Sequence, residues 1–395
     1  MIRYAYRALQ ELEHYLAALS KVIEDLPHHR RYGGPGFPAL PLRVAEQARL
    51  LFSNGIHAKN YYLYELYRKD LSWSQKQSFI GNYGLKSLFA RLNERDYWSV
   101  FDDKVLFTRH MMASGLPVLP IRCALGKHAK LQTIPCLRDE AQVRDWFGQD
   151  GVQNIFIKPV DSQNAKGAIS LGTRINGEAV WDRLPNGSDI GLDSIWAHAQ
   201  EWTSKGTYLI AQDRVEPHPD LAAIVPNILH TVRVVTWLEQ DDVKVIDAVL
   251  KMGKGDYPAD NPFGRGGIVV PLDQASGVCQ QPVWIVDGLV RREDHHPGSG
   301  VRVTGLEIPQ WQDILDIARR AAEACSFHRT LAWDIGVTTE GPVLIEGNWC
   351  PDPALNQIGK DRGLIMTNWV RELNRNRGYK RVGLGLLQAW RRQSR

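Results

Sequence analysis

Apolar positions in the first quarter of the chain recur with helical spacing. Six of them alternate by three and four residues and line one face of a helix: Leu9, Leu12, Leu16, Leu19, Ile23 and Leu26. This stripe is short for a coiled-coil seam, so we favour packing onto its own domain, with the seam as the alternative. Gly and Pro interrupt the pattern over residues 26–41, and helical spacing returns over residues 43–93. We predict a helical N-terminal region over residues 1–95.

From residue 150 onward the pattern changes to strands. Short runs rich in Val, Ile and aromatic residues lie between turn residues over 154–160, 207–215, 230–239, 243–253, 266–273 and 331–349. One strongly helical segment, residues 309–325, lies among them. Strands that follow a helical third of the chain, instead of alternating regularly with helices, favour an α+β fold over a parallel doubly wound sheet.

The last strand pair, residues 331–349, carries polar groups where a buried hairpin needs apolar ones. If residues 339–341 form a three-residue loop, Asp334 stands directly opposite Glu346, and Asn348 shares a face with Glu346. Two facing carboxylates repel each other unless a cation or a shared proton lies between them, and Mg²⁺ prefers such oxygen ligands. The pattern predicts a magnesium site, with a solvent-facing polar stripe as the alternative.

Two lysines stand where regular elements meet loops. Lys158 ends an apolar strand and precedes a Gly-containing loop. A lysine that leaves a buried strand needs water or an anion, and free backbone N–H groups bind phosphate, so this segment indicates a triphosphate contact. An edge lysine that guards against aggregation explains it equally well on local grounds. Lys104 starts a predicted helix, where the helix dipole disfavours a cation, so either a ligand or a surface position explains it.

Composition places the chain among ordinary globular proteins. Its 395 residues, 44% hydrophobic and 23% charged, suffice for a large core and more than one domain. The net charge is +4, but residues 371–395 hold eight Lys or Arg against one acid, which leaves the rest at −3. We therefore expect no nucleic-acid partner. Five scattered cysteines without a CxxC motif indicate a reducing compartment and argue against a structural zinc.

The chain shows neither a membrane span nor a signal peptide. No apolar run reaches the 18 residues of a transmembrane helix, so we predict a cytoplasmic protein. The basic tail, residues 366–395, mixes Leu, Val and Trp with arginines. Two interpretations stay open for it: peripheral contact with an anionic membrane or a glycan-assembly partner, or a solvated, frayed terminus. The sequence leaves the oligomeric state open.

Taken together, these features resemble the ATP-grasp superfamily. They occur in that family's order: a helix and GLPV with a preceding lysine, the strand IKP with its loop, and the hairpin with Asp and then Glu-x-Asn. HTVRVVTW, AVLKMGKGDYPADNPFGRGGIVVPLD and WDIGVTTEGPVLIEGNW resemble, more narrowly, the sugar-transfer-associated ATP-grasp branch, and the resemblance spans residues 45–360. It implies an ATP-grasp domain over residues 96–365, in which two α+β lobes, near 96–210 and 211–365, clasp ATP.

The resemblance also implies roles for individual residues. Those expected at ATP are Lys104, Lys158, Ser162, Asn164, Lys166, Gly167, Gln212 and Val215. Within this set the loop from Ser162 to Gly167 is expected to cover the phosphates, and Gln212 and Val215 are expected to hold adenine at the hinge. Those expected at Mg²⁺ are Asp334, Glu346 and Asn348.

One position departs from the family's pattern. Many ATP-grasp ligases place an arginine two residues before the metal-binding aspartate to steady the transferred phosphoryl group, whereas this chain has Ala332. Arg233 or Arg265 is expected to replace it beside Lys158 as a catalytic residue. Arg233 is the stronger candidate, because a guanidinium in an apolar strand needs an anionic partner. His296 is expected to contact the substrate or the nucleotide.

The resemblance predicts an ATP- and Mg²⁺-dependent ligase. It would join a small-molecule carboxylate to an amine, or less often a thiol, through an acyl phosphate, on a substrate of a sugar or glycan pathway. Two alternatives stay open. One is a kinase on the same scaffold that phosphorylates a hydroxyl, and the other is a non-catalytic ATP-binding component of polysaccharide biosynthesis.

Overall fold

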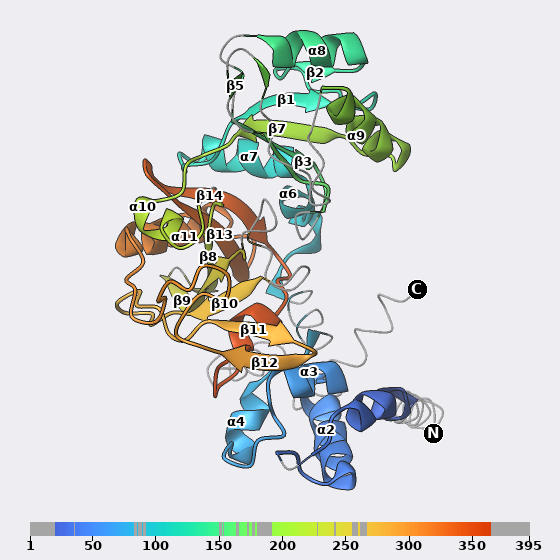
Figure 1. Ribbon diagram of the computed structural model, residues 1–395, viewed down its shortest axis with the longest axis vertical. Helices are drawn as coiled ribbons and strands as arrows, with labels where there is room; N and C mark the ends of the chain where they lie inside the picture. The colour runs from blue at the N-terminus through green and yellow to red at the C-terminus, as the bar shows by residue number, and fades with distance from the viewer. Residues whose placement is uncertain are drawn as a thin grey trace. The chain divides into compact units, whose positions relative to one another are not determined.

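In the computed structural model, the chain forms two compact units (Figure 1). The first unit comprises residues 1–94, 285–292 and 350–395, and the second comprises residues 95–284 and 293–349. The structure describes residues 20–34, 36–82, 85, 89, 92–149, 152, 154–162, 166–171, 174–175, 178–179, 192–226, 228–240, 242–254, 260 and 267–364. The basic tail from residue 366 and the first part of the N-terminal apolar stripe lie outside these residues.

The first unit is mainly helical in its described part, as the pattern of apolar positions predicts. Residues 20–31 form a helix, and the other regular elements are α2 (Leu40–Asn54), α3 (Ala58–Leu63), α4 (Trp73–Ser78), β12 (Leu289–Arg292) and α12 (Ala354–Gln357). Aromatic rings fill its interior, with Tyr32 stacked on Tyr62 at a centroid distance of 4.0 Å. A buried polar network ties the helices together, since the Gln47 amide donates to Asp25 at 3.0 Å.

The described part of the second unit contains two large sheets and a two-stranded one at residues 174–179, and the first large sheet is five-stranded. Its order is β2 (Cys136–Leu137), β1 (Ile121–Leu125), β7 (Leu209–Asp213), β3 (Ile155–Pro159) and β4 (Ile169–Leu171). Among the described pairings of this sheet, β1–β2 alone is parallel, and the others are antiparallel. Helices α8 (Glu140–Gly148) and α9 (Leu192–Ser204) pack on one face, where Ile155 and Ile157 join their apolar side chains in one core.

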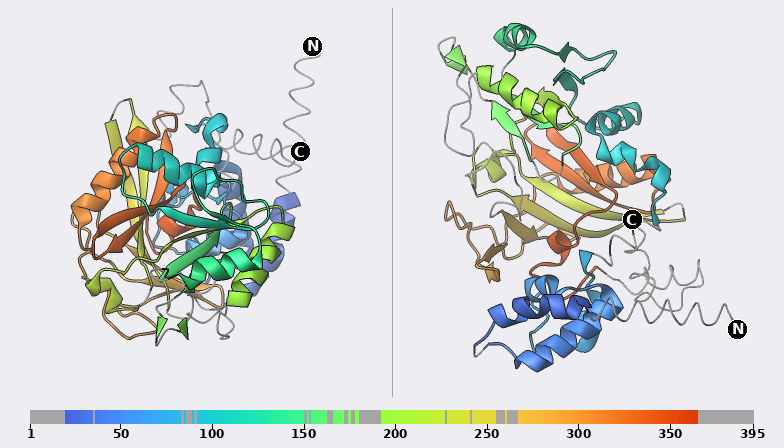
Figure 2. Two further views of the ribbon diagram at one scale, coloured as in Figure 1. Left: turned by 90° about the horizontal axis from the view of Figure 1, so that it is seen from above. Right: turned by 90° about the vertical axis from the view of Figure 1, so that its right-hand side faces the viewer.

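The second sheet of this unit is wholly antiparallel within the described pairings. Its strands follow the order β11 (Val283–Val286), β10 (Ile268–Pro271), β9 (Asp242–Met252), β8 (Thr231–Glu239), β13 (Thr330–Thr338) and β14 (Gly341–Asn348). Helix α11 (Trp311–Ala324) lies along one face (Figures 1 and 2). Because side chains alternate along a strand, Val232 and Val234 pack into the apolar core between the sheet and α11, while Thr231 and Arg233 point to the other face.

The remaining elements of the second unit connect or flank the two sheets. They are η1 (Arg95–Tyr97), α6 (Ser99–Asp102), α7 (Lys104–Ala113), β5 (Arg174–Ile175), β6 (Glu178–Ala179) and α10 (Pro219–Ala222). Asp103 caps α7, since its side chain accepts hydrogen bonds from the backbone N–H groups of Val105 and Leu106. Helices and mostly antiparallel sheets in separate layers confirm the predicted α+β class. No described helix has the length and apolar character needed to cross a membrane.

The hairpin of β13 and β14 reaches the predicted facing pair by a different route. The three-residue loop is wrong: Thr338 pairs with Gly341, so the turn holds two residues, and Ile335 pairs with Leu344. A β-bulge at Ile345 then adds one residue to β14, and Asp334 stands opposite Glu346 after all. Two departures from the predicted register thus cancel.

Candidate active site

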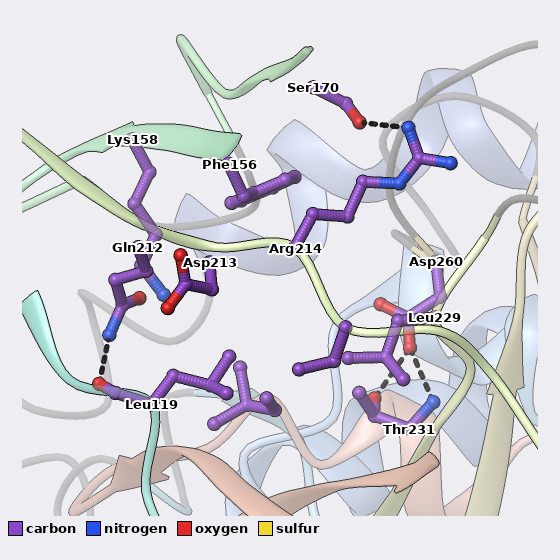
Figure 3. Close-up of a pocket in the computed structure, with 12 residues that line it drawn as sticks. Leu119, Phe156, Lys158, Ser170, Gln212, Asp213, Arg214, Leu229, Thr231 and Asp260 are labelled. Atoms are coloured by element: carbon purple, nitrogen blue, oxygen red, sulfur yellow. Dashed lines mark hydrogen bonds between the residues drawn. The ribbon is translucent and has the colours of Figure 1, made fainter. Parts of the chain in front are cut away.

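An open cavity with about 650 Å³ of empty space lies where the two sheets of the second unit approach each other. The lining residues come from both sheets and their connections: Leu119, Phe156, Lys158, Ser170, Gln212, Asp213, Arg214, Val215, Leu229, Thr231, Asp260 and Ile345. In Figure 3, Phe156 and Lys158 come from β3, and Leu229 and Thr231 lie across the cavity from them.

One part of the cavity is apolar with a few polar groups at its edge. Phe156 lies on the face of β3 away from the helical core, and Leu229 and Ile345 complete the apolar lining. The Gln212 side chain donates to the backbone carbonyl of Leu119 at 2.6 Å (Figure 3). Both predicted hinge residues, Gln212 and Val215, line this cavity. Apolar side chains with a few polar groups at the edge are typical of a small-molecule site.

The bulge in β14 shapes both the cavity and the polar face beside it. It brings the extra residue, Ile345, to the cavity wall and leaves Glu346 and Asn348 on the same face as Asp334. Gly347 points to the opposite face, where an added Cβ would come within 2.9 Å of the ring of Phe101. The glycine between Glu346 and Asn348 therefore allows the aromatic core to approach the strand closely.

Asp334 is held by two cations from neighbouring strands. Arg233, directly opposite on β8, donates from Nε to Oδ1 and from Nη2 to Oδ2, both at 2.7 Å. Lys251 on β9 donates to Oδ2 at 3.0 Å. The three residues are between 4% and 8% exposed. Burial alone opposes the charged carboxylate, but the charges of Arg233 and Lys251 outweigh it and lower the pKa of Asp334 below its usual value.

A second carboxylate balances Lys251 from the cavity side. Asp260 Oδ1 lies 3.6 Å from the Lys251 ammonium, and its Oδ2 accepts hydrogen bonds from the Thr231 backbone N–H at 2.8 Å and hydroxyl at 2.5 Å (Figure 3). Burial raises the pKa of Asp260, and Lys251 offsets part of that rise. Acids and bases therefore alternate from the cavity wall at Asp260 through Lys251 and Asp334 to Arg233.

Two lysines reach the same region from the first sheet and its helix α7. The pKa of Lys158 is lowered to about 8, first by burial and then by the charge of Lys104, while Glu346 opposes the shift. Burial also lowers the pKa of Lys104, whose ammonium donates to the Ser162 carbonyl at 2.6 Å, and Glu346 again opposes. Within the described residues, the Lys158 ammonium has no hydrogen bond or carboxylate partner. A half-buried lysine without a carboxylate partner is typical of a site that binds an anion.

Glu346 and Asn348 supply oxygen atoms that suit a magnesium ion. In the described part of the chain, the half-buried Glu346 carboxylate forms no hydrogen bond or ion pair, and the buried Asn348 side-chain nitrogen has no partner. No group of three or more His, Cys, Asp or Glu side chains among the described residues is arranged to hold a metal. Because Mg²⁺ commonly takes one or two carboxylates and completes its shell with water and phosphate, this donor set fits it.

The predicted phosphate-covering loop and His296 lie in different settings. Asn164 and Arg265 fall outside the described residues. Lys166 is exposed, and the Gly167 carbonyl contacts the His198 ring at 2.9 Å. His296 is 1% exposed; Nε2 lies 3.0 Å from the Gly253 carbonyl and Nδ1 accepts from the Ser299 N–H at 3.0 Å. These contacts use both ring nitrogens of His296: Nδ1 within its own loop and Nε2 at Gly253, just after β9.

Sequence reasoning missed Lys251 and Asp260, although one signal was present. The argument that selected Arg233, a charged group in an apolar strand, applies equally to Lys251 in the run VIDAVLKMG. It also missed the cavity residues Phe156, Arg214 and Ile345. Ile345 could not be found from the pattern, because its place in the cavity wall depends on the bulge.

A comparison with models of protein families gives a match over most of this chain. A family model described as sugar-transfer associated ATP-grasp matches residues 85–371, well over half of the chain. No curated protein matches.

Solved structures show weaker likenesses. D-alanyl-alanine synthetase A from Vibrio cholerae is 13% identical with a TM-score of 0.39, covering 75% of this chain and 66% of that one. An ADP complex of N5-carboxyaminoimidazole ribonucleotide synthetase is 12% identical with a TM-score of 0.37, covering 67% of this chain and 51% of that one. An L-amino acid ligase from Bacillus licheniformis is 13% identical with a TM-score of 0.33, covering 74% of this chain and 48% of that one. The chain thus spans about half to two thirds of the length of these structures.

The family match settles the predicted fold and branch. It runs through the helix α7, both sheets and the hairpin that carries Asp334 and Glu346. The predicted ATP-grasp fold is therefore confirmed, together with the helical region that precedes it. This chain belongs to the sugar-transfer associated ATP-grasp family.

Proposed function

We propose that the protein is an ATP- and Mg²⁺-dependent ligase that joins a carboxylate to an amine, or less often to a thiol. One observation carries the proposal. Three cations lie within electrostatic reach of Glu346: Lys158 from the first sheet, Lys104 from α7 and Arg233 from the second sheet. Lys158 also lines the cavity. Such a set, made of parts from both sheets, is suited to a triphosphate that bridges them.

In this proposal the nucleotide lies with its base in the apolar part of the cavity. Gln212 and Val215 border the base, while Lys104 and Lys158 hold phosphate oxygens. Glu346 and Asn348, with Asp334 behind them, would hold Mg²⁺, which neutralises phosphate charge and orients the triphosphate. Arg233 is the guanidinium that we assign to the transferred group. Asn164 and Arg265, which lie outside the described residues, remain proposed contacts. Ser162, Lys166 and Gly167 are proposed contacts from the described part of the loop, and His296 is one near the substrate.

The reaction divides into two displacements. A substrate carboxylate oxygen attacks the γ-phosphorus of ATP; a new O–P bond forms, the bond from phosphorus to the β–γ bridging oxygen breaks, and ADP leaves. The amine nitrogen then attacks the acyl carbon of the resulting acyl phosphate, the C–O bond breaks, inorganic phosphate leaves, and the amine loses a proton to solvent. The side chains contribute by holding charges in line and by stabilising the developing negative charge.

For the substrate we propose small molecules of a sugar or glycan pathway, which is the setting that the family description names. The support is that description, together with the cavity that Lys158 lines.

Release of ADP and phosphate from Mg·ATP is the direct test. The full chain is incubated with carboxylated sugars or amino acids together with candidate amines, and hydroxylamine is added to trap an acyl phosphate as a hydroxamate. A hydroxamate that requires both ATP and the carboxylate supports the ligase. ADP with a phosphorylated hydroxyl and no hydroxamate identifies the kinase instead. Nucleotide binding without turnover, across all acceptors, contradicts any catalytic role.

A further inference from the structure

Lys251 stands out because it adds a second cation to a carboxylate that already has one. Arg233 occupies both oxygens of Asp334 with two hydrogen bonds of 2.7 Å, and Lys251 adds a third donor at 3.0 Å. An ionised carboxylate offers about four acceptor positions. Only about one position on Asp334 therefore stays free for any further partner.

A divalent cation that approached Asp334 alone would meet two buried positive charges. Arg233 and Lys251 are 7% and 8% exposed, so water screens their repulsion poorly. The phosphates of a nucleotide change this balance, because they give both cations another anionic partner and add negative charge around the metal. Asp334 becomes more available to a metal when phosphate is present.

Asp260 determines how strongly Lys251 acts on Asp334. It lies 3.6 Å from the Lys251 ammonium, and two hydrogen bonds from Thr231 fix its carboxylate. Lys251 is thus shared between two acids. Asp260 and Thr231 both line the cavity, so this balance lies at the wall that an occupant touches.

We propose that Lys251, balanced by Asp260, is a positioning residue that keeps Asp334 from holding a bare divalent cation, so that the metal enters only together with the nucleotide. This inference rests on the proposed function, because it requires that a nucleotide and a metal share this site. It goes further in assigning an order of binding, and in assigning that order to two residues outside the proposed metal ligands.

The test measures Mn²⁺ binding to the full chain by electron paramagnetic resonance, with and without a non-hydrolysable ATP analogue. The main variant is Lys251→Met with Asp260→Asn, which removes one charge of each sign and leaves neither partner buried alone. Asp260→Asn by itself is the second variant. Lys244→Met with Glu239→Gln is the matched control, because this pair joins the end of β8 to an exposed lysine on the same strand as Lys251.

Three results are expected. The wild type and the control bind Mn²⁺ at least tenfold more weakly without the analogue than with it. The Lys251→Met/Asp260→Asn variant binds Mn²⁺ alone at least tenfold more tightly than the wild type, so its dependence on the analogue shrinks. Asp260→Asn shifts in the opposite direction and binds Mn²⁺ more weakly with the analogue, because Lys251 then bears on Asp334 alone.

The outcomes separate this inference from the proposed function. A wild type that binds neither the analogue nor Mn²⁺ with it overturns the proposed function, and this inference with it. A wild type that binds both, but binds Mn²⁺ equally well without the analogue, overturns the inference alone. So does a double variant with the Mn²⁺ affinity of the wild type, once thermal unfolding shows that it is folded.

Discussion

Asp334 and Glu346 face each other across one strand pair, yet their surroundings differ. Asp334 is buried and accepts three hydrogen bonds from two cations. Glu346 is half-buried, and no described residue forms an ion pair or hydrogen bond with it. A carboxylate whose charge the protein already compensates contributes to the structure around it. Glu346, with which no described residue pairs directly, lies within electrostatic reach of Lys104, Lys158 and Arg233 and stays available to a ligand.

The largest effect is expected from Asp334→Asn. The change leaves Arg233 and Lys251 buried with one acid fewer, and losing one partner of a buried ion pair costs about 3–5 kcal/mol. Urea denaturation followed by circular dichroism gives the free energy of unfolding directly. Nucleotide turnover should be lost as well. An unfolding free energy equal to that of the wild type would mean that the charge network around Asp334 is not formed.

Glu346→Gln should separate activity from stability. The substitution removes the negative charge but keeps the shape, so turnover should fall by about 100-fold or more. The free energy of unfolding should change by less than about 1 kcal/mol, because no described partner loses its counter-charge. Steady-state ADP release and the same denaturation experiment measure both quantities. Equal losses of stability in Glu346→Gln and Asp334→Asn would contradict the inference that only Asp334 is held by ion pairs.

Lys158 makes nucleotide binding depend on pH. Its pKa of about 8 means that the ammonium loses its proton as the pH rises through 8, so affinity for an ATP analogue should weaken, by at most about tenfold per pH unit above that value. In the unfolded chain a lysine titrates near 10.4, so between about 8 and 10.4 the unfolded state binds more protons and stability rises with pH.

Titration calorimetry over this pH range provides the measurement for Lys158. Lys158→Met is the reference, because it keeps the length of the side chain and cannot titrate. The affinity of Lys158→Met for the ATP analogue should be lower than that of the wild type near pH 7. Between about pH 7 and 9 it should lack the change that titration of the Lys158 ammonium causes in the wild type. A wild type whose affinity is equally flat would show that the Lys158 ammonium does not contact the phosphates.

The smallest effect is expected from Gln212→Leu. The variant loses the hydrogen bond to the Leu119 carbonyl, which stabilises by about 1 kcal/mol, and leaves that acceptor without its donor. The KM for ATP should rise several-fold with little change in kcat, since the contact lies at the proposed base and not at the phosphates. A fall in kcat with unchanged KM would place the base elsewhere in the cavity.

The sequence by itself was sufficient for the local features. Apolar spacing predicted the helical N-terminal region and the later strands, and the order of the lysine, loop and Glu-x-Asn signatures predicted the family. Each of these depends on neighbours within one element or on the identity of a short motif. Periodicity and turn residues report such neighbours directly.

Only the tertiary structure decided which charges meet. Arg233 and Lys251 lie 101 and 83 residues from Asp334 along the chain, so their contacts depend on the order and register of β8, β9 and β13. A single bulge at Ile345 sets the register of β14, and a shift by one residue moves every side chain to the other face. Spacing along the sequence carries no measure of that register, because it is fixed by packing between strands that are distant in the chain.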